Sequence, residues 1–155
     1  YDLNKHSSAF IHQDYALVPQ LSAFHNVCIG RIDKNGTLHN ILNLLKPRQD
    51  ELKEIRPLLE SLGMSDKLSD PVSELSGGQQ QRVAIARALA GSPRFLLADE
   101  PTGNLDPGTS DQVFAALMDL VAGTGLSALV ATHNHELAAR MDRRVKLEQG
   151  RLIEL

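Results

Sequence analysis

A serine followed by two glycines is the part of this chain best suited to binding phosphate. Residues 75–79 read Leu-Ser-Gly-Gly-Gln and lead into a helical pattern over residues 80–90. Glycines at a helix start leave the first backbone N–H groups uncovered, and these groups favour an anion at the positive end of the helix dipole. Ser76 can cap that helix and offer its hydroxyl. Taken alone, the same segment could equally be a simple turn.

Two adjacent carboxylates, Asp99 and Glu100, follow the short apolar run of residues 95–98. Such a run is typical of a buried parallel strand, and open α/β sheets bind ligands at the carboxyl ends of their strands. One carboxylate can hold Mg²⁺ through water while the other polarises a nucleophilic water. If the pair stood alone, a solvated Asp-Glu turn would be the simpler interpretation.

Two further strands are expected to end on polar side chains. Residues 9–12 predict a strand that ends at Gln13, and residues 126–132 predict a buried strand that delivers His133. Imidazole can donate to a phosphate oxygen near neutral pH, whereas a lone glutamine after a strand is usually only a loop residue. His135 and Glu136 begin like a zinc protease pattern, but Ala139 stands where the second histidine is required, so zinc is not predicted.

The remaining elements are predicted from helical and strand periodicity. Arg82 and Arg87 are expected on the exposed side of helix 80–90, solvated or salt-bridged. Pro57 is expected to interrupt a helix that ends at Gly63, a residue suited to the C′ position. The expected helices are residues 21–32, 37–45, 50–62, 109–121 and 136–141, and the expected closing hairpin pairs residues 144–148 with residues 151–155.

Composition limits the possible functions. At 155 residues the chain is one ordinary domain, and its net charge of −3 gives no basic face, so no nucleic-acid partner is suggested. One cysteine, Cys28, excludes an internal disulfide. No apolar run approaches the roughly 20 residues needed to span a bilayer, so we expect any membrane association to come through a partner.

Together these motifs resemble the nucleotide-binding subunit of ABC transporters. Residues 75–79 match the family signature letter for letter, residues 95–100 match the Walker B strand with its catalytic glutamate, and residues 104–106 match the D-loop. Gln13 and His133 match the Q-loop and H-loop residues, although His12 stands where the family often has an aromatic. The resemblance implies an α/β, P-loop NTPase-like parallel sheet with a small α-helical subdomain. Its expected parts are residues 1–20 (strand and Q-loop), 21–72 (helical subdomain) and 73–155 (signature helix to closing strands).

The resemblance also implies a mechanism in a head-to-tail dimer that binds ATP and Mg²⁺. Asp99 and Gln13 would organise Mg²⁺, Glu100 would be the general base, and His133 would stabilise charge on the phosphate. Asp106 would couple the two sites across the dimer. The residues that would bind the γ-phosphate of ATP held by the partner subunit are Ser76, Gly77, Gly78 and Gln79.

One family motif is absent from these 155 residues. No glycine is followed by lysine, so the P-loop pattern G-x-x-x-x-G-K-[S/T] occurs nowhere. Since the chain also begins with Tyr1, it is expected to be the latter two thirds of such a domain. The P-loop carries much of phosphate binding, so we expect the 155 residues alone neither to bind ATP tightly nor to hydrolyse it, while the full-length parent is expected to be an ATPase.

The type of transporter is less clearly indicated. Residues 98–106 and 142–155 resemble the lipoprotein-releasing and macrolide-export branch, which we favour, whereas residues 17–22, 26–27 and 30–31 resemble phosphonate-import ATPases. Transmembrane permease subunits would bind residues 14–72, which places the subunit at the cytoplasmic face of the bacterial inner membrane. A non-transport ABC ATPase and a non-catalytic remnant are the alternatives; the first usually has tandem domains or a long coiled-coil insertion, and neither is visible.

Overall fold

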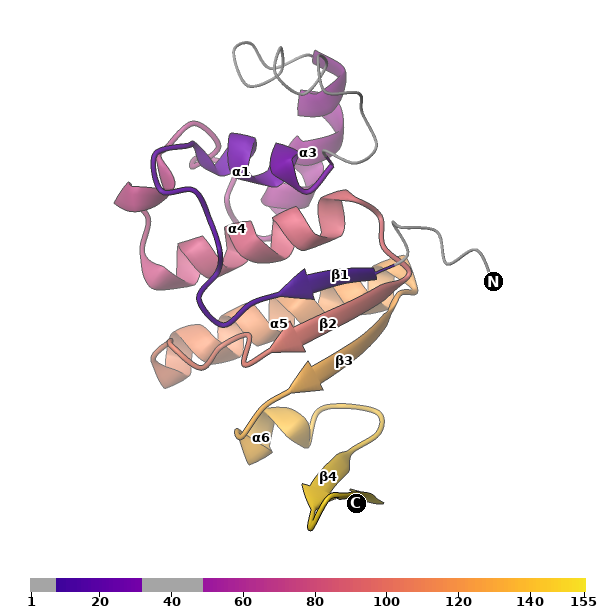
Figure 1. Cartoon of the computed structure of the whole chain (residues 1–155). Coiled ribbons are helices and arrows are strands. Elements are labelled where there is room, and N and C mark those ends of the chain that lie inside the picture. The colour runs from indigo at the N-terminus through magenta and orange to yellow at the C-terminus, as the bar shows by residue number, and fades with distance from the viewer. Residues whose placement is uncertain (1–7, 32–48) are drawn as a thin grey trace.

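The computed structural model describes residues 8–31 and 49–155 (Figure 1). The expected helix over residues 37–45 lies outside them. The helices are α1 (Ala23–Ile29), α3 (Gln49–Ser61), α4 (Gly77–Ala90), α5 (Pro107–Thr124) and α6 (His135–Ala138), with a 3₁₀ turn η2 (Val72–Glu74). The strands are β1 (Ser8–Ile11), β2 (Phe95–Asp99), β3 (Ser127–Ala131), β4 (Val145–Glu148) and β5 (Arg151–Glu154).

Strands β1, β2 and β3 form a parallel sheet in that order, and β4 pairs with β5 in an antiparallel hairpin. Ile11 lies opposite Ala98, and Asp99 lies opposite Ala131. The carboxyl ends of the three parallel strands therefore meet at one edge of the sheet. This edge carries Gln13, the Asp99–Glu100 pair and His133, as the sequence predicted.

Helices α4 and α5 cover one face of this sheet (Figure 1). Ile11, Leu96 and Ala98 point into a core that is closed by buried side chains of both helices. Helices α1 and α3 pack on α4 and extend the same core away from the sheet, which forms the expected helical layer. The helix side chains at the centre of this core are Phe24, Val27, Ile55, Leu59, Val83, Ile85, Val113 and Leu117.

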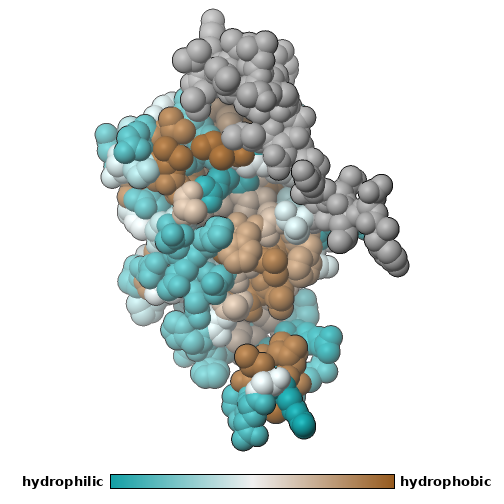
Figure 2. All heavy atoms as spheres, in the orientation of Figure 1, coloured by the Kyte–Doolittle hydropathy of each residue, from teal (hydrophilic) through white to brown (hydrophobic). Residues whose placement is uncertain are grey.

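The opposite face of the sheet is open to solvent. Phe10, Phe95 and Leu129 are 43%, 37% and 52% exposed, and they lie on the same side of the pleat because Phe10 and Leu129 both pair with Leu97. Figure 2 shows hydrophobic atoms gathered over these strands and again over the β4–β5 hairpin. The prediction that β2 and β3 are fully buried strands is therefore wrong: each is covered on one face only.

One helix prediction also needs correction. Helix α3 continues through Pro57, because its buried face of Ile55, Leu59 and nearby Leu62 is held by tertiary packing. Gly63 does adopt the left-handed conformation expected of a C′ residue, with φ of 68°. Helix α4 begins at Gly77, so both signature glycines lie inside its first turn. Within the described ranges, no helix is long and apolar enough to cross a membrane.

Candidate active site

The signature segment forms the capped N-terminus of α4. The Gln79 N–H donates to Ser76 Oγ at 3.4 Å and the Ser76 N–H donates to Gln79 Oε1 at 2.9 Å, which together make a capping box. Among the described residues, the amides of Gly77 and Gly78 have no hydrogen-bond partner. Two N–H groups at the positive end of a 14-residue helix therefore remain available to an external anion such as phosphate.

The two signature glycines have different surroundings. A Cβ at Gly78 would lie 2.4 Å from Thr109 Cγ2, so glycine is what lets α4 approach the first turn of α5. A Cβ at Gly77 would lie 3.5 Å from Leu105 Cδ2 and 3.7 Å from the Tyr15 hydroxyl. The signature thus stands between the Q-loop and the D-loop.

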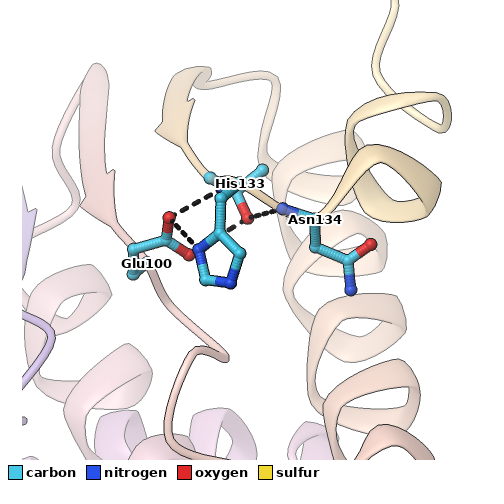
Figure 3. Close-up of polar contacts among 4 residues, drawn as sticks. Glu100, His133 and Asn134 are labelled. Atoms are coloured by element: carbon cyan, nitrogen blue, oxygen red, sulfur yellow. Dashed lines mark hydrogen bonds and ion pairs between the residues drawn. The ribbon is translucent and has the colours of Figure 1, made fainter.

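Glu100 and His133 are brought into direct contact at the sheet edge (Figure 3). Glu100 Oε1 accepts a hydrogen bond from the His133 backbone N–H at 2.7 Å and lies 2.7 Å from His133 Nδ1. An ionised carboxylate can only accept, so Nδ1 carries the proton of this second bond. The Glu100 side chain is 20% exposed and the His133 side chain 82% exposed, so the carboxylate is sheltered while the imidazole edge faces solvent.

The backbone and Thr132 fix the direction of the Glu100 side chain. Glu100 has φ of 45°, a left-handed conformation that non-glycine residues rarely adopt. Its N–H donates to Ala131 O at 2.9 Å and its carbonyl accepts from the Gly103 N–H at 3.0 Å. The Thr132 hydroxyl donates to Glu100 Oε2 at 3.1 Å, a contact that sequence analysis missed although Thr132 immediately precedes His133.

Gln13 and Asp99 complete the edge. The Asn104 side chain donates to Gln13 O at 3.0 Å, so the D-loop holds the start of the Q-loop. Asp99 is exposed at the end of β2. A carboxylate and an amide oxygen on neighbouring strands are ligands that suit Mg²⁺, which usually takes one or two protein oxygens and completes its shell with water and substrate phosphate. The described residues contain no cluster of three or more His, Cys, Asp or Glu that could hold a metal by itself.

The signature and the carboxylate edge lie at the same end of the molecule but are separate. In Figure 1 the N-terminus of α4 and the arrowheads of β1–β3 point to the same side. The structure brings Glu100 and His133 into contact, and in the described residues it shows no hydrogen bond or ion pair between either of them and residues 76–79.

Asp106 is the N-cap of α5. Its carboxylate accepts from the Thr109 N–H at 3.0 Å, and this hydrogen bonding lowers its pKa below the usual value of 3.8. Its position in the fold is thus a helix start next to the signature.

The expectation that Arg82 and Arg87 are solvated or salt-bridged is wrong. Arg82 Nη1 donates to Leu62 O at 3.0 Å, and Arg87 donates to the carbonyls of Tyr15 and Ala16 in the Q-loop. Both guanidinium groups lie against neighbouring segments of the chain and donate to backbone carbonyl oxygens there. Periodicity alone does not reveal such partners.

A sequence model of the ABC transporter family matches residues 2–103, well over half of the 155 residues. The chain belongs to the ABC transporter family. The matched region includes Gln13, the signature and the Asp99–Glu100 pair, whereas Asp106 and His133 lie beyond it.

Curated relatives are similar along nearly the whole chain. The lipoprotein-releasing system ATP-binding protein LolD of Cereibacter sphaeroides is 54% identical over 144 residues, which cover 93% of this chain and 60% of the relative. LolD of Ruegeria pomeroyi is 52% identical over 143 residues, with 92% and 58% covered. The chain thus spans about 60% of the length of the curated relatives it matches.

Solved structures confirm the α/β cassette fold. An inward-facing metal-chelate type ABC transporter superposes with a TM-score of 0.81 at 26% identity, over 96% of this chain and 58% of that one. The dimeric structure of MJ0796, a bacterial ABC transporter cassette, gives a TM-score of 0.76 at 33% identity, over 95% and 61%.

Proposed function

We propose that this chain is part of the ATP-hydrolysing subunit of an ABC transporter of the lipoprotein-releasing type. The observation that carries the ATPase assignment is the Glu100–His133 pair, held at 2.7 Å on the carboxyl edge of a parallel sheet. The transporter type is supported by the names of relatives that are 54% and 52% identical to this chain.

Bound Mg·ATP would supply the phosphoanhydride bond whose γ-phosphoryl group passes to water. Glu100 accepts the proton of that water, and its sheltered position keeps the carboxylate directed at the edge where Gln13 and Asp99 would hold Mg²⁺. His133 directs Glu100 through two hydrogen bonds, and its exposed imidazole can turn to donate to a phosphate oxygen.

The signature would act on a nucleotide held by a second subunit. The unpaired amides of Gly77 and Gly78 and the hydroxyl of Ser76 would bind the γ-phosphate from the far side, and Gln79 would hold Ser76 in its capping position. The separation of the signature from Glu100 within one chain supports a head-to-tail dimer, in which each site uses residues of both subunits. Asp106, beside the signature at the start of α5, would then lie at the dimer boundary.

The remaining partners follow from the same assignment. Residues 14–72 would contact the transmembrane permease subunits, which would hold the ATPase at the cytoplasmic face of the inner membrane as a peripheral protein. Lipoprotein extraction would be the work done by ATP hydrolysis.

The test is a chimera in which this chain replaces the matched 144-residue region of Cereibacter sphaeroides LolD; we refer to it as the LolD chimera. It should hydrolyse ATP in the presence of Mg²⁺ and, with the other components of that lipoprotein-releasing system in vesicles, should support release. A folded LolD chimera without Mg-dependent hydrolysis would contradict the ATPase assignment. Hydrolysis without release would retain the ATPase and contradict the lipoprotein assignment.

A further inference from the structure

Two consecutive residues of the Q-loop have an unfavourable backbone conformation. Tyr15 and Ala16 have φ of 63° and 47°, the left-handed region in which a Cβ meets the following carbonyl. Neither is glycine, asparagine or aspartate, the residues that enter this region most easily. Such a conformation persists only where surrounding structure holds it.

Arg87 of α4 is the side chain that holds these two residues. Its Nη2 donates to Tyr15 O at 2.8 Å and its Nη1 donates to Ala16 O. A planar guanidinium can bind two neighbouring carbonyl oxygens at once, which an ammonium group cannot do with the same geometry. Burial lowers the pKa of Arg87, which fits a cation that has exchanged water for these carbonyls.

Arg87 itself has little room to move. A Cβ at Gly30, which caps the C-terminus of α1, would lie 2.0 Å from Arg87 O and 3.1 Å from Arg87 Cγ. Helix α1 therefore rests directly on the backbone and stem of Arg87, and only the guanidinium extends towards the Q-loop.

The loop on either side of Tyr15 and Ala16 is anchored separately. Asn104 of the D-loop donates to Gln13 O at 3.0 Å. Fully buried Asn26 accepts from the Val18 N–H at 2.8 Å and donates to Val18 O at 3.0 Å. The segment between these anchors is the part that Arg87 ties to α4.

We propose that Arg87 is a positioning residue that fixes the Q-loop to the signature helix. Its two hydrogen bonds tie the backbone at Tyr15 and Ala16 to α4, so that this part of the Q-loop and the Ser76–Gly78 segment move as one unit. An effect of this link on ATP hydrolysis rests on the proposed function, whereas the link between the Q-loop and α4 does not.

The test is amide hydrogen exchange on the whole chain, compared among wild type, Arg87→Met, Arg87→Lys and Arg82→Met. The amides of Tyr15, Ala16 and Val18 are protected by bonds to His12 O, Asp14 O and Asn26 Oδ1. Arg87→Met should accelerate exchange in residues 12–18 by about tenfold or more, because the strained turn loses both donors. Arg87→Lys should give a smaller acceleration in the same segment.

Arg82→Met is the matched control, since Arg82 lies on the same helix and also donates to a backbone carbonyl, Leu62 O. It should accelerate exchange around residues 60–64 and leave residues 12–18 unchanged. Wild-type exchange of residues 12–18 in Arg87→Met, or equal acceleration there in Arg82→Met, would overturn the proposal.

If Arg87→Met does not fold, hydrogen exchange in Arg87→Lys tests the proposal. Faster exchange confined to residues 12–18 supports the two-carbonyl contact, and wild-type exchange there overturns it. A failure of the proposed function would appear instead as a LolD chimera that does not hydrolyse ATP, and it would leave the exchange result unaffected.

Discussion

Both oxygens of Glu100 are engaged before any substrate is bound. Oε1 accepts from the backbone and Nδ1 of His133, and Oε2 accepts from Thr132. A carboxylate has about four acceptor sites, so Oε2 could still accept a proton from water while these three bonds are in place. The bond to the His133 ring is the one most easily released, because that side chain is 82% exposed. Once released, the His133 ring would be free to donate to phosphate.

At the scale of single residues, Asp106 gives a prediction about how the stability of the fold depends on pH. Its pKa in the folded chain lies below 3.8, so its charged form contributes stability above that value, and the contribution is lost as the pH falls through the lower folded pKa. Asp106→Asn keeps a capping oxygen but removes the charge at the helix N-terminus. We expect the variant to be less stable than wild type at pH 7, with a difference that shrinks below pH ~4.

Urea unfolding midpoints at pH 7, 5 and 3 measure this difference. Asp119→Asn is the control, since Asp119 is exposed on the later part of the same helix, where a negative charge does not complement the dipole. Its midpoint at pH 7 should be unchanged or slightly higher than that of wild type. An Asp106→Asn deficit that is equal at all three pH values would show that the charge contributes nothing.

The contact between α1 and α4 gives a prediction at the scale of elements. Gly30→Ala would place a Cβ 2.0 Å from Arg87 O, and a backbone atom cannot move away without displacing a whole helix. Helix α1 must shift off α4, at a cost of about 1–3 kcal/mol in the free energy of unfolding. Urea unfolding followed by circular dichroism measures it.

Gly123→Ala is the matched control in α5, where no atom lies within 4 Å of the added Cβ. It should leave stability unchanged or raise it by up to about 1 kcal/mol, because alanine favours helix over glycine. Equal effects of the two substitutions would contradict the close approach of α1 to α4.

Local sequence patterns predicted the helices and strands better than they predicted the contacts between distant parts of the chain. The strand–carboxylate pattern at residues 95–100 and the Ser-Gly-Gly start of α4 are local, and both could be read from the sequence. The contacts of Arg87, Asn26 and Asn104 could not be read from the sequence. Their partners are backbone carbonyls or amides at sequence separations of 8, 71, 72 or 91 positions. Pro57 was misjudged for a related reason: the packing that keeps α3 helical lies outside the helix itself.

At the scale of the whole molecule, the main feature is the solvent-exposed face of the β1–β2–β3 sheet. Parallel sheets are normally covered on both faces, yet Phe10, Phe95 and Leu129 form an apolar surface on this 155-residue chain (Figure 2). The hairpin adds Leu147 and Leu152, which are 70% and 73% exposed. Whether a strand is covered on both faces depends on what lies beside it in space, so the apolar runs of β2 and β3 could not reveal it.

This surface should bind a hydrophobic dye. We expect the 155-residue chain to bind anilinonaphthalene sulfonate while folded, and Leu129→Thr to lower the fluorescence with little loss of stability, since Leu129 is 52% exposed. The same substitution at fully buried Leu117 should instead cost about 2–5 kcal/mol. Dye binding that Leu129→Thr leaves unchanged would show that the dye binds elsewhere.

The most direct test of the central claim is ATP turnover by the LolD chimera carrying Glu100→Gln. Loss of the general base should lower the hydrolysis rate by about 10²–10⁴-fold while Mg·ATP still binds, so that ATP remains bound and unhydrolysed. Glu136→Gln, the same change on exposed Glu136 three residues after His133, should hydrolyse ATP at the wild-type rate. Wild-type turnover by Glu100→Gln would contradict the assignment of Glu100, and with it the account of the site.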